Sequence, residues 1–275
     1  MKIKPKFGCI GLGFIFERHL ASIEAIGGEI TVGCDIDPDK QYKLPNSAKF
    51  VADYKQMAEV ADFDYIAVCA PNDLHDEIAD FYREYRIIME KPITINPEKY
   101  NWDRDNIYCM HQLRFLPEVM NLKAHVDINR EARNPNVPIK AKITMEIRRD
   151  QWYFDSWKGD AKRSGGLAFN IGIHYFDLLC WLFGKPIGYK ITGDNLHWLK
   201  ADVEFREAQT ELYLTLDAPM DKQKRLIEVN GKMINLNKID QLHTEVYRQL
   251  INGYGIKPIQ VENVYRLVED ITKAF

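Results

Sequence analysis

The chain has 275 residues, of which 46% are hydrophobic and 28% charged, and its formal net charge at pH 7 is −3. This length and composition are typical of a globular enzyme of one or two domains. The slightly acidic charge provides no basic surface for a nucleic acid or an anionic membrane, so we expect neither as a partner.

Short apolar runs alternate with segments of helical spacing in the first half of the chain. The strand-like runs are Phe7–Gly11, Ile30–Cys34, Tyr65–Cys69, Arg86–Met89 and Ile107–Met110. The helical segments are Arg18–Ile26, Tyr54–Ala61 and Leu74–Tyr85. Strands that alternate with helices predict a parallel, doubly wound sheet. We therefore expect an α/β protein whose residues 1–117 form a Rossmann domain.

The second half of the chain has the pattern of antiparallel strands. Lys140–Arg148 and Glu211–Leu216 alternate apolar with polar residues, as strands with one solvated face do, and Asn230-Gly231 predicts a hairpin turn. The predicted helices begin near Leu167 and span about 241–252 and 260–274. We expect residues 118–275 to form an α+β domain with an open, mostly antiparallel sheet. Such an open sheet favours a homodimer or a homotetramer.

The five cysteines lie at positions 9, 34, 69, 109 and 180, without a Cys-x-x-Cys pair or a Cys/His cluster. We therefore expect buried thiols in a reducing compartment and no metal site. No apolar run approaches the length that crosses a bilayer, and the first apolar run is cut by glycines too early for a signal peptide. These features predict a cytoplasmic protein.

A dinucleotide site is indicated by Gly11 and Gly13, which follow the first predicted strand and open the first predicted helix. Such glycines let the backbone approach a pyrophosphate, which the helix N-terminus attracts. Phe16 stands where the usual motif has a third glycine. Asp35 ends the next strand at the expected distance, and its carboxylate suits the ribose hydroxyls and repels a 2′-phosphate, which favours NAD over NADP. The alternative is that Asp35 only begins a turn with Pro38.

Polar residues also follow the next two predicted strands. Ligands of open α/β sheets lie beyond the carboxyl ends of the strands, so we expect Asn72 and His75 near the cofactor. His75 at the surface of a helix start is the alternative. Glu90 and Lys91 follow the apolar run 87–89, where two charges are costly unless they serve a function. An exposed turn with a charged pair is the other interpretation.

Taken together, these residues resemble the glucose–fructose oxidoreductase/inositol dehydrogenase (Gfo/Idh/MocA) family. The matching motifs are Gly8-Cys-Ile-Gly-Leu-Gly13, His19-Leu20, Ala70-Pro-Asn72 with His75, Glu90-Lys-Pro92, and Gly165-Gly166 followed by Asn170, Gly172, His174 and Asp177. The resemblance implies hydride transfer between NAD(P) and a sugar, a cyclitol or a related alcohol. It implies that the cofactor contacts Gly11, Gly13, Phe14, Ile15, Asp35, Ile36, Pro71, Asn72, His75, Glu90 and Lys91.

The second half is similar to one subgroup, the UDP-N-acetylglucosaminuronate (UDP-GlcNAcA) 3-dehydrogenases. The motifs are Gln112-Leu-Arg114, Trp152-Tyr153-Phe154, Ser156-Trp-Lys-Gly-Asp160, Asn170-Ile-Gly-Ile-His174 and Leu242-His-Thr244. The resemblance implies oxidation of the substrate's C3 hydroxyl, with a 3-keto product used for lipopolysaccharide O-antigen sugars. It implies substrate contacts by Gln112, Arg114, Tyr153, Lys158, Asn170 and His174. Asn170 replaces the aspartate of many family members, as in the subgroup.

Asn170, His174 and Asp177 are four and three positions apart, which places them on one stripe of a helix. The resemblance makes His174 the expected base for the hydroxyl proton, because histidine titrates near neutral pH. Lys91 is expected to stabilise negative charge on the same oxygen, and the two residues can share or exchange these roles. Asn170 positions the substrate, and Asp177 either orients the imidazole or ties the helix to a neighbouring element. A structural histidine is the alternative interpretation of His174.

Two other functions fit the same residues. One is the dehydrogenation of another sugar or cyclitol, and the other is a non-catalytic NAD-binding regulatory protein, against which Lys91 and His174 argue. Gly165 and Gly166 are expected to leave room for the nicotinamide and the sugar. The segment 93–106 is shorter than usual for the family and is expected to lack a full helix.

Overall fold

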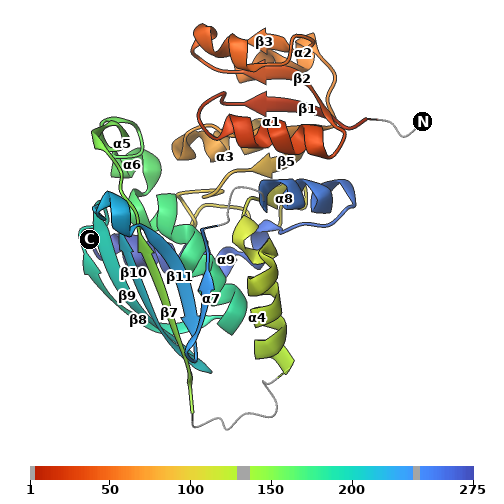
Figure 1. Ribbon diagram of the computed structural model, residues 1–275. Coiled ribbons are helices and arrows are strands. Elements are labelled where there is room, and N and C mark those ends of the chain that lie inside the picture. Colours follow the sequence, from red (N-terminus) through yellow and green to blue (C-terminus); the bar gives the residue numbers. More distant parts are fainter. Residues whose placement is uncertain (1–3, 129–136, 238–241) are drawn as a thin grey trace. The chain divides into compact units, whose positions relative to one another are not determined.

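The computed structural model describes residues 4–128, 137–237 and 242–275, which form two compact units (Figure 1). The first unit comprises Met1–Thr94, Lys99–Met110 and Asp240–Gln260, and the second comprises Ile95–Glu98, His111–Ile239 and Val261–Phe275. The sequence predicts a single boundary after residue 117. In the structure the chain passes into the second unit at His111. The segment 240–260 belongs to the first unit again, and its helix packs on the first helix of the chain.

The first unit contains the predicted parallel sheet. Its strands are β1 (Lys6–Ile10), β2 (Glu29–Cys34), β3 (Lys49–Val51), β4 (Tyr65–Val68), β5 (Arg86–Met89) and β6 (Ile107–Cys109). They pair in parallel in the order β3-β2-β1-β4-β5-β6, so the order reverses between β1 and β4. Ligands of doubly wound sheets bind outside the carboxyl ends of the strands at this reversal.

Within the described residues, the α-helices of the first unit are α1 (Phe16–Ala25), α2 (Met57–Val60), α3 (His75–Phe81) and α8 (Leu242–Ile251). Helix α1 buries one stripe that includes His19, Ser22 and Ile23, and α8 packs against it. The connection between β5 and β6, residues 93–106, contains neither helix nor strand, as the sequence predicts.

The second unit contains a mixed, mostly antiparallel sheet. Its strands are β7 (Ile139–Glu146), β8 (Pro186–Gly193), β9 (Trp198–Phe205), β10 (Ala208–Thr215), β11 (Lys224–Val229) and β12 (Lys232–Asn235). Their order is β12-β11-β7-β10-β9-β8, and only β7 and β10 pair in parallel. Asn230 and Gly231 have φ angles of 47° and 83°, which is the geometry of a tight hairpin turn between β11 and β12.

Helices cover one face of this sheet. Those that contact its strands are α7 (Ile173–Phe183) and α9 (Glu262–Lys273). The second unit also contains α4 (Pro117–Ile128), α5 (Gln151–Asp155) and α6 (Ala161–Ser164). A π-helical turn, Ala168–Gly172, leads into α7, which contacts α9 and β10. The sequence prediction that no run is long and apolar enough to cross a bilayer is wrong by length and composition alone, because Ala161–Phe183 passes that test; 83% of its apolar window is nevertheless buried. That burial is typical of the core helix of a folded domain.

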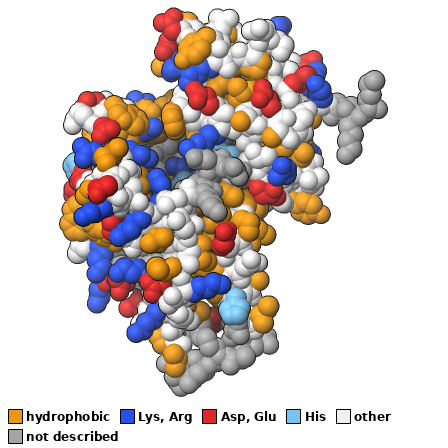
Figure 2. All heavy atoms as spheres, viewed as in Figure 1, with side chains coloured by type: hydrophobic (Ala, Val, Ile, Leu, Met, Phe, Trp, Pro, Cys, Tyr) orange, Lys and Arg blue, Asp and Glu red, His pale blue; other side chains and the backbone are white. Residues whose placement is uncertain are grey.

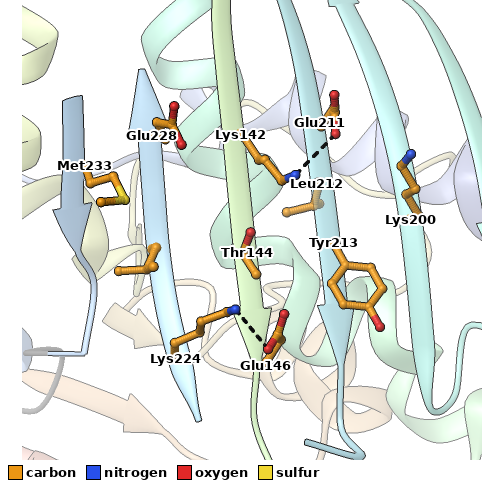
Figure 3. A pocket seen from close by; sticks show the side chains of 11 residues that line it. Lys142, Thr144, Glu146, Lys200, Glu211, Leu212, Tyr213, Lys224, Glu228 and Met233 are labelled. Atoms are coloured by element: carbon orange, nitrogen blue, oxygen red, sulfur yellow. Dashed lines mark ion pairs between the residues drawn. The ribbon is translucent and has the colours of Figure 1, made fainter. Parts of the chain in front are cut away.

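The other face of the sheet is open and charged (Figure 3). Lys142 lies 3.7 Å from Glu211, and Lys224 lies 3.2 Å from Glu146, across neighbouring strands. The alternation along β7 places Ile143 and Met145 in the core and their neighbours on this face. Acidic and basic side chains are mixed over the face of the molecule that Figure 2 shows.

Candidate cofactor and substrate sites

The turn after β1 has room for a ligand beside it. Gly11 has a φ of +88°, and a Cβ atom there would lie 2.7 Å from the Cys69 carbonyl oxygen, so only glycine fits. A Cβ on Gly13 would meet nothing within 4 Å, which shows that this glycine borders open space. Phe16 is the first residue of α1 and is fully buried, so its ring belongs to the core. Phe14 and Ile36 are exposed beside the turn and beyond β2.

Asp35 ties this turn to the end of β2. Its Oδ2 accepts a hydrogen bond from the Leu12 N–H at 2.8 Å, and its Oδ1 accepts bonds from the Asp37 N–H and the Lys40 ammonium, both at 3.0 Å. Burial acts to raise the pKa of Asp35, but the N–H groups of Asp37 and Leu12 and the Lys40 charge outweigh it and lower the pKa. Asp35 is therefore an ionised carboxylate at the carboxyl end of β2, next to the turn after β1, and it also begins the turn considered as its alternative role.

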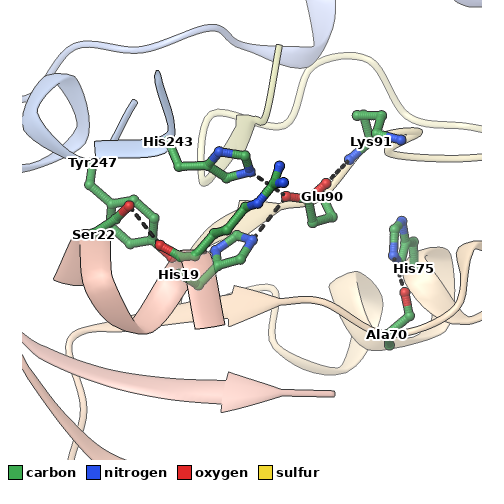
Figure 4. Close-up of polar contacts among 9 residues, drawn as sticks. His19, Ser22, Ala70, His75, Glu90, Lys91, His243 and Tyr247 are labelled. Carbon is green, nitrogen blue, oxygen red and sulfur yellow. Dashed lines mark hydrogen bonds and ion pairs between the residues drawn. The ribbon is translucent and has the colours of Figure 1, made fainter. Parts of the chain in front are cut away.

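His75 links the loops that follow β4 and β5 (Figure 4). It is fully buried, and its ring nitrogens lie 2.7 Å from the Pro92 carbonyl oxygen and 3.0 Å from the Ala70 carbonyl oxygen. The alternative of a solvent-facing His75 is therefore wrong. Asn72 is also buried and begins a 3₁₀ turn after Pro71. These loops hold the carboxyl ends of β4 and β5 in fixed positions.

Glu90 is the centre of a buried polar cluster in the first unit (Figure 4). Its Oε1 lies 2.9 Å from Nε2 of His19 and 3.5 Å from Nε2 of His243, and the Tyr247 hydroxyl lies 2.7 Å from Nδ1 of His19. Burial acts to raise the pKa of Glu90, but hydrogen bonds and charge interactions with the two histidines hold it well below its usual range. The alternative of an exposed charged turn at Glu90 is therefore wrong.

Sequence reasoning missed the role of α8 in this cluster. His243 and Tyr247 are four positions apart, a spacing that places both on one face of a helix, but nothing local indicates that this face meets α1. Lys91 follows Glu90 and is half-buried, and its backbone N–H donates to Glu90 Oε2 at 3.3 Å. The cluster thus holds the residue that precedes Lys91.

In the second unit, Asn170 and His174 lie at the start of the core helix. Asn170 is buried in the π-helical turn, and its Nδ2 donates to the Tyr153 hydroxyl at 2.7 Å. His174 is the second residue of α7 and is half-buried. Gly165 and Gly166 serve packing rather than ligand space. Both have positive φ, and added Cβ atoms would lie 2.6 Å from Phe169 and 2.5 Å from Asn195.

Asp177 pairs with Arg114 rather than with His174. Oδ2 and Oδ1 of Asp177 accept hydrogen bonds from Nε and Nη2 of Arg114 at 2.9 and 2.6 Å, and both side chains are buried. Nδ1 of His111 lies 3.5 Å from Asp177, so this pair ties α7 to the 3₁₀ turn Gln112–Phe115. Of the two predicted roles of Asp177, the structural tie is the one observed. The pair engages Nε and Nη2 of Arg114 in a structural contact, and the substrate contact expected of Arg114 stays a prediction.

Lys158 lies among aromatic rings. Its Nζ is 5.2, 5.9 and 6.0 Å from the ring centres of Trp152, Trp157 and Tyr153. Burial lowers its pKa, and the nearby Arg149 charge acts in the same direction. Lys91 belongs to the first unit, whereas Lys158, Tyr153, Asn170 and His174 belong to the second. Their meeting over one substrate is therefore proposed below rather than observed.

The first unit fits a dinucleotide by its own geometry. The glycine turn leaves open space at Gly13, the N-terminus of α1 has no side-chain cap because its N-cap residue is Ile15, and an ionised carboxylate lies at Asp35. Backbone N–H groups at a helix start suit a pyrophosphate, and a carboxylate suits ribose hydroxyls.

Family models match both parts of the chain. A model described as "Oxidoreductase family, NAD-binding Rossmann fold" matches residues 5–101, and one described as "Oxidoreductase family, C-terminal alpha/beta domain" matches residues 137–237. The two ranges together cover more than half of the chain. The first unit therefore contains an NAD-binding Rossmann domain.

Two curated relatives are dehydrogenases, one of glucose 6-phosphate and one of inositol. The chain is 26% identical to glucose-6-phosphate 3-dehydrogenase of Bacillus subtilis over 196 residues, which is 65% of this chain and 53% of the relative. It is 24% identical to inositol 2-dehydrogenase of Rhizobium meliloti over 199 residues, which is 68% of this chain and 58% of the relative. The chain thus spans little more than half the length of these relatives.

Solved structures of similar fold cover the chain almost completely. The WlbA (WbpB) dehydrogenase from Thermus thermophilus, in complexes with NAD and either UDP-GlcNAcA or alpha-ketoglutarate, has a TM-score of 0.87 at 26% identity. These matches cover 98% of this chain and 94% of that one. The WlbA dehydrogenase from Bordetella pertussis, in complex with NADH and UDP-GlcNAcA, has a TM-score of 0.82 at 18% identity, covers 100% and 96% of the two chains, and supports the shared fold alone.

Proposed function

This chain belongs to the Gfo/Idh/MocA family of NAD-binding oxidoreductases, and on that premise we propose that it oxidises the C3 hydroxyl of UDP-GlcNAcA to the 3-keto sugar. The observation that carries the proposal is the Asn170–Tyr153 hydrogen bond beside Lys158 in the second unit. It puts a polar amide, a phenol and a cation together next to the helix that bears His174. The similarity to a dehydrogenase that binds NAD and UDP-GlcNAcA supports the same substrate class.

The reaction requires that a hydride leave C3 and that the hydroxyl proton leave to a base. Bound NAD supplies the hydride acceptor. His174 or Lys91 takes the proton, and the other residue donates a hydrogen bond to the oxygen as negative charge develops there. Asn170, held by Tyr153, orients the sugar, because its amide both donates and accepts hydrogen bonds.

The buried cluster around Glu90 positions Lys91 for this reaction. It holds the backbone just before Lys91, so the lysine projects from a fixed point at the carboxyl end of β5. Positioning of this kind lowers the entropic cost of bringing the reacting groups together.

The test is incubation of the purified protein with NAD and UDP-GlcNAcA, followed by mass spectrometry of the sugar product. NADH that stays bound can give a small absorbance signal, so the reaction is also run with alpha-ketoglutarate as a second substrate. We expect a product two mass units lighter than the unlabelled substrate, and a product without deuterium when the substrate carries deuterium at C3. Absence of this product under both conditions would refute the proposed substrate.

A second candidate is oxidation of another sugar or a cyclitol by the same residues. The similarity to glucose-6-phosphate 3-dehydrogenase and inositol 2-dehydrogenase supports it. Turnover of glucose 6-phosphate or myo-inositol at a higher kcat/KM than UDP-GlcNAcA would favour it. NAD binding without turnover of any of these substrates would favour the regulatory alternative. We further propose a cytoplasmic homo-oligomer with a role in O-antigen sugar synthesis.

A further inference from the structure

Three cationic side chains gather at one end of the sheet in the second unit. Arg149 follows β7, Lys158 follows α5, and Arg225 lies on β11, the strand beside β7. Arg149 is held by its backbone N–H, which donates to the Leu216 carbonyl oxygen at 2.9 Å. The three charges are close enough that Arg149 acts on the pKa of Lys158, and Arg225 on that of Arg149. They form a cluster of like charge.

Carboxylates form direct ion pairs with the neighbouring cations but, among the described residues, not with these three. Arg148 lies 3.1 Å from Asp150, and Lys224 lies 3.2 Å from Glu146. Within the described parts of the chain, Arg149, Lys158 and Arg225 form no ion pair with a carboxylate, and Arg225 donates instead to the neutral Asn237 amide. The Asp150 charge acts on Arg149 without an ion pair. A group of cations that no carboxylate contacts directly is typical of a site whose anion comes from a ligand.

The alternation of the strand directs Arg225 toward the helix-covered face of the sheet. Lys224 belongs to the open, ion-paired face, so the side chain of the next residue lies on the opposite face. There Arg225 and Arg149 act to lower the pKa of the buried Tyr175 on α7, which burial raises to about 12. The cluster therefore faces the helix that bears His174.

Tyr153 connects the cluster to the proposed substrate residues. Its ring centre is 5.9 Å from the Arg149 guanidinium and 6.0 Å from the Lys158 ammonium, and its hydroxyl accepts from Asn170. Burial lowers the pKa of both cations, so their charged forms are disfavoured there, and an anion bound beside them would stabilise them.

We propose that Arg149, Lys158 and Arg225 form an oxyanion subsite, which binds a carboxylate or a phosphate of the substrate beside Asn170 and selects acidic sugars over neutral ones. The inference rests on the proposed function, because it assigns this subsite to the same substrate site. Arg149 and Arg225 lie outside the motifs that indicated substrate contacts.

The experiment is calorimetric binding to the NAD-loaded protein with four probes: UDP-GlcNAcA, UDP-N-acetylglucosamine, glucose 6-phosphate and glucose. The variants are Arg149→Gln, Lys158→Gln and Arg225→Gln, with Arg149→Lys to restore the charge and Arg148→Gln as the matched neighbour. Thermal unfolding shows whether each variant is folded. If Arg149→Gln does not fold, Arg149→Lys still tests the role of this residue. We expect a roughly ten- to hundredfold loss of affinity for the acidic ligand in the Gln variants. A hydrogen bond to a charged group changes a binding constant by about this factor. Arg148→Gln should bind like the wild type.

The probes distinguish the two sources of the oxyanion. A loss confined to UDP-GlcNAcA assigns the subsite to the carboxylate, and an equal loss for both UDP-sugars assigns it to the diphosphate. If the wild type binds glucose 6-phosphate but no UDP-sugar, and the variants lose that binding, the subsite stands and the proposed substrate is wrong. Variants that bind every ligand as the wild type does, or a wild type that binds no acidic probe, would overturn the inference.

Discussion

Nε2 of His19 on α1 lies 2.9 Å from Oε1 of Glu90 at the end of β5, and both side chains are buried within the first unit. The two residues are 71 positions apart in the chain. Tyr247 and His243 from α8 complete the cluster around them. This contact connects the first helix, the strand that precedes Lys91 and a helix from the last part of the chain, so it bears on both stability and catalysis.

Replacement of Glu90 by Gln should lower the free energy of unfolding by roughly 1–3 kcal/mol at neutral pH, because it weakens hydrogen bonds to two buried histidines. The folded state depresses the pKa of Glu90, so its ionised form stabilises the fold above the ordinary value of 4.5, and this contribution is lost as the pH falls through the folded-state pKa. Urea unfolding between pH 3.5 and pH 8 should therefore show a wild-type advantage that shrinks below about pH 4.5. Glu24→Gln, at an exposed position of α1, is the control. A difference in stability between the wild type and Glu90→Gln that did not change with pH would contradict the depressed pKa of Glu90.

Replacement of Gly11 by Ala should destabilise the first unit and weaken NAD binding, because the new Cβ would contact the Cys69 carbonyl at 2.7 Å. Gly27→Ala is a matched control, since Gly27 has a similar φ of +77° but nothing within 4 Å of the added carbon. The control should cost about 1 kcal/mol and Gly11→Ala clearly more. Thermal unfolding with and without NAD measures both effects. Equal costs would show that the close approach at Gly11 is unimportant.

Replacement of Asp35 by Ser should weaken NAD binding about tenfold and narrow the preference for NAD over NADP. The carboxylate that suits the ribose hydroxyls is removed. Lys40, 3.0 Å away, keeps only the longer contact of 3.9 Å with Asp37 and becomes more available to a 2′-phosphate. Fluorescence titrations with NADH and NADPH give the ratio of the two dissociation constants. Asp39→Asn, an exposed change in the same loop, should leave it unaltered. A preserved ratio in the Asp35 variant would place the ribose elsewhere.

Replacement of His174 by Asn should reduce the rate of the chemical step by roughly 10²–10⁴-fold while substrate affinity changes little. Lys91→Met should do the same with NAD binding retained. Single-turnover formation of the 3-keto sugar, measured as a function of pH, distinguishes the roles of the two residues. Only loss of the base removes the pH dependence of the rate. His197→Asn, an exposed histidine paired with Asp194, is the control. Unchanged turnover in the His174 variant would refute its role as catalyst.

Replacement of Arg114 by Ala should cost about 3–5 kcal/mol of stability, because the buried Asp177 carboxylate is left without its bidentate partner. The exposed pair Arg248 and Glu245 should contribute at most about 1 kcal/mol when broken in the same way. Thermal unfolding compares Arg114→Ala with Arg248→Ala. If Arg114→Ala left stability intact and weakened only substrate binding, the structural role of this pair would be wrong.

The sequence by itself determined the features that depend on short-range pattern. The alternation of strands and helices, the glycine turn after β1 and the Asn230-Gly231 hairpin were predicted, because side-chain periodicity and backbone conformation are local properties. The NAD-binding domain was predicted for the same reason, since its motif is a turn, a helix start and a carboxylate at a set distance.

Tertiary structure alone decided the partners of the buried charges. Nothing near Arg114 indicates that Asp177 will occupy its guanidinium, and nothing near Glu90 indicates that α8 will return with His243. Arg149 and Arg225 lie 76 positions apart and share a cluster only because β7 and β11 are neighbours in the sheet. Charge interactions depend on distance in space and on burial, and neither can be read from spacing along the chain.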